Sequence, residues 1–285
     1  IDSRGAKYID DQNIDSLFSE PEYISVIKQQ NDPDPYRLLN LKQDGSLGSF
    51  NQNSNFHIYF LEQDLHGYSG IKPRTYQDIA DIVTPANPTL WRMLNVRYIV
   101  AEQPLPFPGF VPLFAREKDF LFRNENALQR AYFVDSVASM PSLQVLQAIR
   151  NNEFDPAEVA FVEKDAPLVD RPDSTAYVVV EKYEDEYISI NANASGTHLL
   201  FLGDTYYPHG WNAYINGNET EILRVNHGFR GIIVPEGKHT IEFIYAPSSF
   251  YIGRALAIIF SGLIVIGFIL GYFLNRRKNL SELSN

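Results

Sequence analysis

The sequence predicts an α+β domain, then an all-β sandwich, and then one transmembrane helix near its C-terminal end. Strands alternate with short helices over residues 36–165, a mixture typical of α+β domains. Seven alternating strands separated by glycine and asparagine turns follow over residues 176–247, as in a β-sandwich. Residues 255–274 form an apolar run without a charge, and a membrane-spanning helix needs ~20 such residues.

The first part of the chain, residues 1–35, is polar and acidic and contains three prolines. Such a stretch buries little apolar surface, so we expect a linker or a segment draped over the domain. One amphipathic stretch near residues 22–30 predicts a single helix within it.

The α+β domain is predicted from apolar periodicity and turn chemistry. We expect helices at residues 75–83, 90–94 and 142–151. The expected strands are residues 36–41, 57–61, 96–100, 110–116, 119–123, 130–134 and 158–163. Pro167 and the run Arg171-Pro172-Asp173 mark the expected boundary to the next domain.

The sandwich is predicted from strands that recur every 8 to 12 residues. We expect these strands at residues 177–183, 187–193, 198–203, 211–216, 220–225, 228–234 and 240–245. The turns Asn216-Gly217-Asn218, Asn226-His227-Gly228 and Pro235-Glu236-Gly237 supply residues that tolerate positive φ. The last strand leads directly into the apolar run.

The apolar run 255–274 has the flanks of a membrane span. Phe250 and Tyr251 precede it and Tyr272 and Phe273 close it, as interfacial aromatic belts do, and three basic residues follow at 276–278. The basic cluster predicts that residues 275–285 are a cytoplasmic tail and that residues 1–253 lie outside the cytoplasm. The alternative is a buried helix of a large soluble protein.

Charge and cysteine content narrow the class of protein. The whole chain has a net charge of −11, and the part before the span has 20 Lys and Arg against 34 Asp and Glu, which gives −14. Such a surface repels nucleic acid and anionic lipid headgroups, so no nucleic acid is expected as a partner. The apolar run 255–274 makes the lipid bilayer the expected partner. There is no cysteine, so disulfides and thiol chemistry are excluded, and this fits a bacterial envelope. The chain starts Ile-Asp-Ser-Arg without an export signal, so we expect it to be the C-terminal part of a longer polytopic membrane protein.

Several motifs together resemble a known family. They are the run 203–217, which reads GDTYYPHGWNAYING, then residues 224–226, 229–231, 234–239 and Phe243, and upstream residues 67–72 with Arg74, Tyr76 and Gln77, and residues 94–99. In this order, with an apolar helix behind them, they resemble the closing segment of the YfhO-like bacterial membrane proteins. His209 is an insertion relative to the family pattern. The resemblance spans most of residues 36–274.

The resemblance implies a role at the outer face of the bacterial cell (inner) membrane. The family is similar to C-type glycosyltransferases, which take sugar from a polyprenyl-phosphate carrier, so the expected donor for the whole protein is a polyprenyl-phosphate-linked sugar and the expected acceptor a cell-envelope glycopolymer. The catalytic acid of that class lies in an early outer loop, so we expect no catalytic residue and no cofactor in this part. This part of the protein would instead recognise the acceptor or the sugar, or shape the entrance of the active site. The alternative is a non-catalytic envelope-binding or scaffolding module.

Other motifs that could carry chemistry have simpler interpretations. Asp32-Pro33-Asp34 imitates a metal-binding acidic pair but predicts a turn, since two prolines adjoin the aspartates. The six histidines have no zinc-site spacing, so we expect no metal. Ser69 lies in Gly67-Tyr68-Ser69-Gly70, which lacks the pattern of a nucleophile elbow, so a turn residue is expected.

One cluster could bind carbohydrate. Tyr206, Tyr207 and Trp211 have flat apolar faces that suit stacking on a sugar ring. Asp204, Asn226 and Arg230 could form hydrogen bonds with its hydroxyl groups. The alternative is structural: Tyr206 and Trp211 would be core aromatics, and Asp204 would pair with Arg230 to fix a loop.

Overall fold

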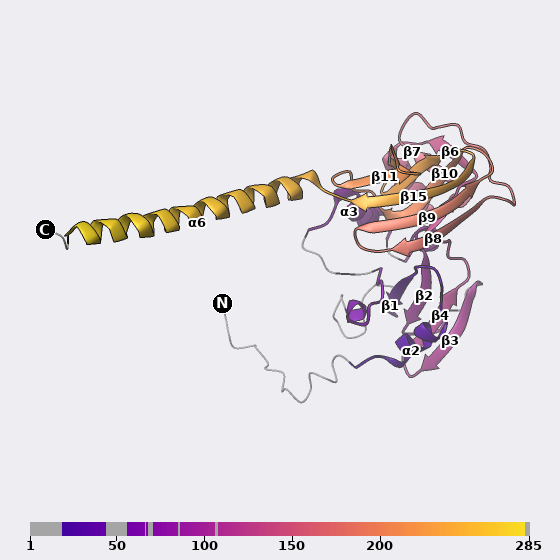
Figure 1. Ribbon diagram of the computed structural model, residues 1–285. Helices are drawn as coiled ribbons and strands as arrows, with labels where there is room; N and C mark the ends of the chain where they lie inside the picture. The colour runs from indigo at the N-terminus through magenta and orange to yellow at the C-terminus, as the bar shows by residue number, and fades with distance from the viewer. Residues whose placement is uncertain are drawn as a thin grey trace.

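The computed structural model of the chain describes residues 19–43, 56–65, 67, 71–84, 86–105 and 108–282, with the side chains of the last helix described as far as Phe273. Figure 1 shows a small mixed sheet near the N-terminal end, a larger β-rich body above it, and one long helix that leaves the body. This is the predicted combination of α+β, all-β and C-terminal helical parts.

The first sheet has the strand order β1-β2-β4-β3. Strands β1 (Arg37–Leu41) and β2 (Val96–Ala101) are parallel, and β4 (Asp119–Asn124) and β3 (Phe110–Arg116) continue the sheet as an antiparallel hairpin. Helix α2 (Glu22–Gln29) packs Tyr23, Ile24 and Ile27 against one face of this sheet. The helix predicted near residues 22–30 is therefore confirmed. Residues 1–18 lie outside the described residues.

The strand predicted at residues 57–61 is wrong, because Phe56–Phe60 forms a 3-10 helix, η2. Phe56, His57 and Phe60 are buried, whereas Ile58 and Tyr59 are exposed. A strand would bury alternate residues, but this spacing of i, i+1 and i+4 places the buried side chains on one helical face. The rings of Phe56 and Phe60 meet edge to face at 5.1 Å within the core of the first sheet.

The second sheet has the order β13-β14-β10-β5 and is covered on both faces. Its central strand β10 (His198–Thr205) is buried from His198 to Asp204, which explains its continuous apolar run. Strands β13 (Leu223–Val225) and β14 (Phe229–Val234) lie on one side of it. On the other side is β5 (Ala131–Phe133), where Tyr132 stacks on Phe201 at 5.0 Å. Residues 131–133 thus join the same sheet as residues 198–205, although they precede the expected domain boundary, and the division at residues 165–176 stays a prediction.

The third sheet completes the sandwich. Its order is β12-β11-β15-β9-β8. These strands are β8 (Tyr177–Tyr183), β9 (Tyr187–Ala194), β11 (Trp211–Ile215), β12 (Asn218–Thr220) and β15 (Gly237–Tyr245). Strand β9 buries every second side chain, so Ile188 and Ile190 pack with Phe243 against the second sheet. The single strand predicted at residues 220–225 is wrong, because β12 pairs with β11 and β13 pairs with β14 in the other sheet.

Three helices cover the other face of the second sheet. They are α3 (Arg74–Ile82), α4 (Pro88–Met93) and α5 (Ser142–Asn151). The parallel pair β6 (Ser136–Ser139) and β7 (Val159–Val162) precedes and follows α5 in the chain. Asn87 caps α4, since its Oδ1 accepts a hydrogen bond from Leu90 N at 2.8 Å, and its Nδ2 donates to Ile149 O of α5 at 2.9 Å. This amide therefore fixes two helices against each other.

The last helix, α6 (Ser248–Glu282), projects away from the body in Figure 1. Residues 248–273 are long and apolar enough to cross a membrane, with a mean hydropathy of 2.5 over the best window. No residue of that window is buried against the rest of the described chain, which favours a membrane span over the alternative of a buried helix. Among the described residues, α6 is therefore the candidate membrane span, and it supports membrane association of the chain.

Candidate functional site

Asp204, at the end of β10, is the centre of a buried charge cluster. Its carboxylate accepts from Arg37 Nη2 at 2.7 Å, from Arg130 Nη1 at 3.1 Å and from the Tyr183 hydroxyl at 2.9 Å. Arg37 comes from β1 and donates also to Leu94 O and Gly203 O. The cluster thus connects the first sheet, the second sheet and β8.

The cluster carries more positive than negative charge. Burial opposes the ionisation of Asp204, but the charges of Arg37, Arg130 and Arg230 outweigh it and hold the pKa of this carboxyl below its usual value of 3.8. Burial, with repulsion from Arg37, lowers the pKa of Arg130 to about 10, so this fully buried guanidinium remains charged at neutral pH. Three guanidinium groups therefore surround one carboxylate.

Arg230 takes a different position from the one that the structural alternative predicts. Its Nε donates to Thr205 O at 3.0 Å, and its guanidinium lies 3.9 Å from the centre of the Trp211 ring. No ion pair joins it to Asp204 in the described part of the chain, so the predicted Asp204–Arg230 pair is wrong; Arg37 and Arg130 take that role. Within the same part, Arg230 Nη1 is buried without a hydrogen-bond partner. Arg230 is thus held by stacking more than by hydrogen bonds.

The predicted aromatic residues line a cavity of about 220 Å³. Its walls are Tyr206, Tyr207, Pro208, Trp211, Asn212, Glu219, Thr220, Glu221, Ile222 and Arg230. The Tyr207 side chain is 40% exposed, and Tyr206 and Trp211 are half-buried. Arg230 stacks on the Trp211 ring and the Tyr245 ring lies 5.4 Å away at a tilt, so part of the indole packs on protein and part faces the cavity. We call this cavity the aromatic pocket.

Two predicted site residues, Asp204 and Asn226, do not line the aromatic pocket: Asp204 lies in the buried charge cluster, and Asn226 lies elsewhere in the core. Asn226 is fully buried, its Oδ1 accepts from Phe161 N at 2.8 Å, and its Nδ2 points at Met93 Sδ at 3.4 Å. Its amide therefore ties β7 to the β13–β14 turn and has a structural role.

The aromatic pocket adjoins the start of the membrane helix. Gly210 O accepts from Ala246 N at 2.7 Å, two residues before α6 begins. A Cβ at Gly210 would lie 2.7 Å from the Tyr245 ring and 3.0 Å from Pro247 Cβ, so only glycine allows this approach. The loop between β10 and β11 is therefore attached to the segment from which the span begins.

A second cavity, of about 330 Å³, was not foreseen from the sequence. Its walls are Arg37, Asp64, Leu65, Gly67, Lys72, Tyr76, Ile79, Ala80, Leu90, Leu94, Thr205, Gly228 and Phe229. Thr205 lines this cavity and its neighbour Tyr206 lines the aromatic pocket, so the two hollows flank the end of β10. We call this second cavity the junction cavity. The resemblance motifs 67–72 and Tyr76 could have drawn attention to it, but nothing in their spacing indicates a cavity.

A buried chain of polar side chains stands behind the junction cavity. His57 Nδ1 lies 2.7 Å from Asp64 Oδ2, and the Tyr23 hydroxyl lies 2.9 Å from His57 Nε2. Both members of the His57–Asp64 pair have side chains that are at most 1% exposed. This chain satisfies buried polar groups in the core and anchors Asp64 in the cavity wall.

The remaining candidate residues have structural partners. Arg97 pairs with Asp32 at 2.8 Å and approaches Asp34 at 4.0 Å, so this acidic pair is neutralised by protein. No group of three or more His, Asp or Glu side chains that could hold a metal ion occurs among the described residues. Ser69 lies outside them.

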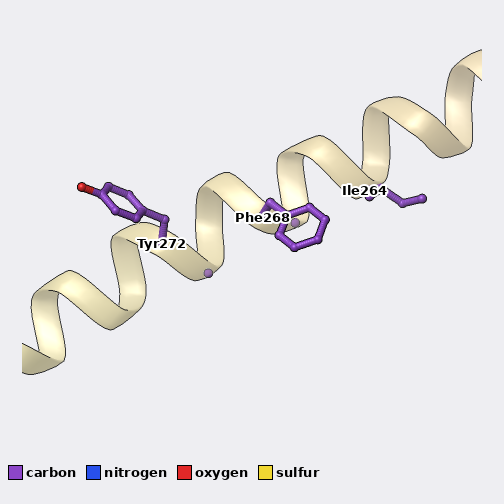
Figure 2. Close-up of a pocket in the computed structure, with 5 residues that line it drawn as sticks. Ile264, Phe268 and Tyr272 are labelled. Atoms are coloured by element: carbon purple, nitrogen blue, oxygen red, sulfur yellow. The ribbon is translucent and has the colours of Figure 1, made fainter.

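An apolar groove also runs along α6. Figure 2 shows Ile264, Phe268 and Tyr272 on successive turns, and Gly267 and Gly271 complete its lining. Glycines let a neighbouring helix approach closely within a membrane, so this groove belongs to the lipid-facing or helix-packing surface of the span.

Comparison with known proteins agrees with the membrane helix and the sandwich. No curated protein matches the chain significantly. The model of one family, described as bacterial membrane protein YfhO, matches residues 173–257. This range contains all strands of the third sheet, three of the four strands of the second, and the start of α6. The chain is therefore similar to the YfhO family of bacterial membrane proteins over its sandwich and the beginning of its membrane span.

Proposed function

We propose that this chain is the outer, membrane-tethered part of a glycosyltransferase-like envelope protein, and that it recognises a sugar without catalysing its transfer. The observation that carries the proposal is the aromatic pocket beside the start of α6. Tyr206, Tyr207 and Trp211 offer ring faces, and Asn212 and Glu219 offer polar groups at the rim. Aromatic faces combined with a few polar groups are the usual means of orienting a sugar ring.

The size of the aromatic pocket limits what it holds. Its volume of about 220 Å³ equals that of roughly seven water molecules, which is enough for one sugar ring. Typical pockets for larger ligands measure roughly 300–1,000 Å³. We therefore infer that a single terminal sugar binds, with a Kd on the order of 1 mM or weaker, as few polar contacts would imply.

The direct test uses Tyr207→Ala, because this exposed ring contributes to the aromatic pocket and little to the core. Tyr177→Ala is the matched control, since Tyr177 is 47% exposed on β8, an edge strand of the third sheet, and does not line the aromatic pocket. Saturation-transfer NMR with a panel of monosaccharides, on the full chain in nanodiscs, should give a signal that Tyr207→Ala reduces at least threefold and Tyr177→Ala leaves unchanged. Equal signals in both variants would contradict sugar binding in this pocket.

A cellular assay separates the proposed role from the scaffold alternative. Tyr207→Ala and Trp211→Ala should each lower glycosylation of the envelope polymer in intact bacteria, provided that the protein is folded and inserted. Unchanged glycosylation in both variants, with loss of envelope integrity only when the whole protein is removed, would favour a non-catalytic scaffold.

The orientation belongs to the same proposal. The basic residues 276–278 after the span support a cytoplasmic C-terminus and an outer sandwich at the bacterial cell membrane. The chain contains no cysteine, so single cysteines report cleanly. A membrane-impermeant thiol reagent should label Asn218→Cys but not Ser281→Cys in intact cells, and the reverse result would overturn this orientation.

A further inference from the structure

We infer that the junction cavity binds a small organic anion with an apolar body, such as a medium-chain carboxylate or alkyl phosphate. Its volume of about 330 Å³ corresponds to roughly eleven water molecules, enough for a chain of about eight carbons with a charged head. The inference does not rest on the proposed sugar site, which lies on the other side of Thr205 and Tyr206.

The apolar part of the ligand is defined by the apolar side chains of the wall. They come from α3, from α4 and the residue after it, from the start of β14 and from the loop at residue 65. They are Leu65, Ile79, Ala80, Leu90, Leu94 and Phe229. An alkyl chain in contact with them would leave water, and this burial of apolar surface favours binding. A free inorganic anion would leave this surface unused.

The charged part is defined by Arg37 and Lys72. Arg37 belongs to the cluster of three guanidinium groups around Asp204, so the cation behind the cavity is not fully neutralised. Lys72 is exposed and has no ion-pair partner within the described residues. Asp64 opposes an anion, but its carboxylate is 1% exposed and held by His57. The local charges of the cavity wall therefore favour a negative head group near Lys72, although the overall charge of the chain is −11.

Two hydroxyl groups can orient the head group. Tyr76 and Thr205 both line the cavity, and neither hydroxyl makes a hydrogen bond within the described part of the chain. Burial raises the pKa of Tyr76, so its hydroxyl stays protonated and can donate a hydrogen bond to an anion. Two donors and a cation on an apolar wall are the features of a small-molecule site for an amphipathic anion.

The experiment is calorimetric titration of the full chain in phosphatidylcholine nanodiscs, with empty nanodiscs as the blank for partitioning. The probes are octanoate, octyl phosphate, octanol and octylammonium. Octanoate and octyl phosphate should bind at least ~10-fold more tightly than octanol, and octylammonium should not bind measurably. Octanol binding as tightly as octanoate, or heats equal to those of empty nanodiscs, would overturn the inference.

Variants locate the binding in the cavity. Lys72→Met should weaken octanoate binding by about threefold to tenfold and leave octanol unchanged, as expected for one partly solvated charge. Lys118→Met is the matched control, because Lys118 is also an exposed lysine and lies on the β3–β4 turn, away from the cavity wall. Ala80→Phe should fill the cavity and abolish binding. If that variant does not fold, Thr205→Val removes one hydroxyl at nearly constant shape and should weaken octanoate several-fold; unchanged binding in a folded Ala80→Phe or in Thr205→Val contradicts the site.

Adding anionic phospholipid to the nanodiscs distinguishes two sources of the anion, a membrane lipid and a soluble molecule. If a membrane lipid head group is the natural occupant, adding anionic phospholipid to the nanodiscs should compete with octyl phosphate and reduce its apparent affinity. If the occupant is a soluble metabolite-sized anion, the affinity should stay the same. Tyr207→Ala should leave octanoate binding unchanged in either case, so failure of the sugar site and failure of this site can be told apart.

Discussion

Replacing Asp204 by asparagine should cost more stability than any exposed carboxylate of this chain. The Asp204 carboxylate is 8% exposed and faces Arg37 at 2.7 Å and Arg130 at 3.1 Å. The asparagine side chain would keep the shape but leave Arg130, which is fully buried, without a negative partner. Breaking a buried pair in this way costs ~3–5 kcal/mol, mainly because the remaining charge stays buried.

The matched control is Asp135→Asn. Asp135 pairs with Arg171 at 2.8 Å, a distance like that of Arg37 and Asp204, but the two side chains are 29% and 78% exposed. Exposed pairs contribute less than about 1 kcal/mol. For a body of this size, 1 kcal/mol corresponds to ~2–4 °C, so the expected fall in Tm is roughly 6–20 °C for Asp204→Asn and a few degrees at most for Asp135→Asn.

The assay is thermal unfolding of the full chain in nanodiscs, followed by tryptophan fluorescence. The two tryptophans report on different parts of the chain, since Trp91 packs against the first sheet and Trp211 lines the aromatic pocket. Because the cluster joins these parts, both signals should shift. If Asp204→Asn lowers the Tm no more than Asp135→Asn does, the cluster has no structural role, and the reasoning from uncompensated charge is refuted.

Two further changes test local features. Burial lowers the pKa of His227 below 6.5, against the opposing effect of Asp78, so the histidine takes up a proton more readily in the unfolded chain than in the folded one. The neutral His227 therefore contributes its full stability above about pH 6.5, and this contribution is lost as the pH falls through the folded pKa. Urea unfolding at pH 7.5 and 5.5 should therefore show a smaller pH dependence in His227→Gln than in the natural chain, and an equal dependence would count against it. Gly210→Ala places a Cβ 2.7 Å from the Tyr245 ring at φ +117°, whereas the Cβ of Gly217→Ala, at φ +79°, meets open space. Gly210→Ala should therefore lower the free energy of unfolding by ~1–3 kcal/mol more than Gly217→Ala does, seen as a larger fall in Tm. An equal fall in Tm would contradict the steric argument.

Local patterns in the sequence predicted most elements correctly, because the periodicity of side chains is a local property. The alternation in residues 187–194 and the uncharged run of α6 each determine their structure without reference to distant residues. One error arose where a distant partner decides the structure. Residues 220–225 look like one strand, yet pairing with β11 and with β14 divides them between two sheets.

The candidate site shows the same limit. Tyr206, Tyr207, Trp211 and Arg230 were predicted together because they lie within 25 residues, and the structure does bring them to one pocket. Arg37 lies 167 residues before Asp204, and no pattern near either residue indicates their pairing. A buried carboxylate is expected to pair with a cation, but the sequence alone does not show which arginine is its partner.

The charge cluster connects the two hollows through the end of β10. Arg37 lines the junction cavity, Arg230 lines the aromatic pocket, and both act electrostatically on Asp204. An anion near Arg37 would offset part of the repulsion that Arg37 exerts on Arg230, whose Nε donates to Thr205 O. Because Arg230 also stacks on Trp211, a change on one side of the Thr205–Tyr206 segment reaches the ring on the other side by direct contact.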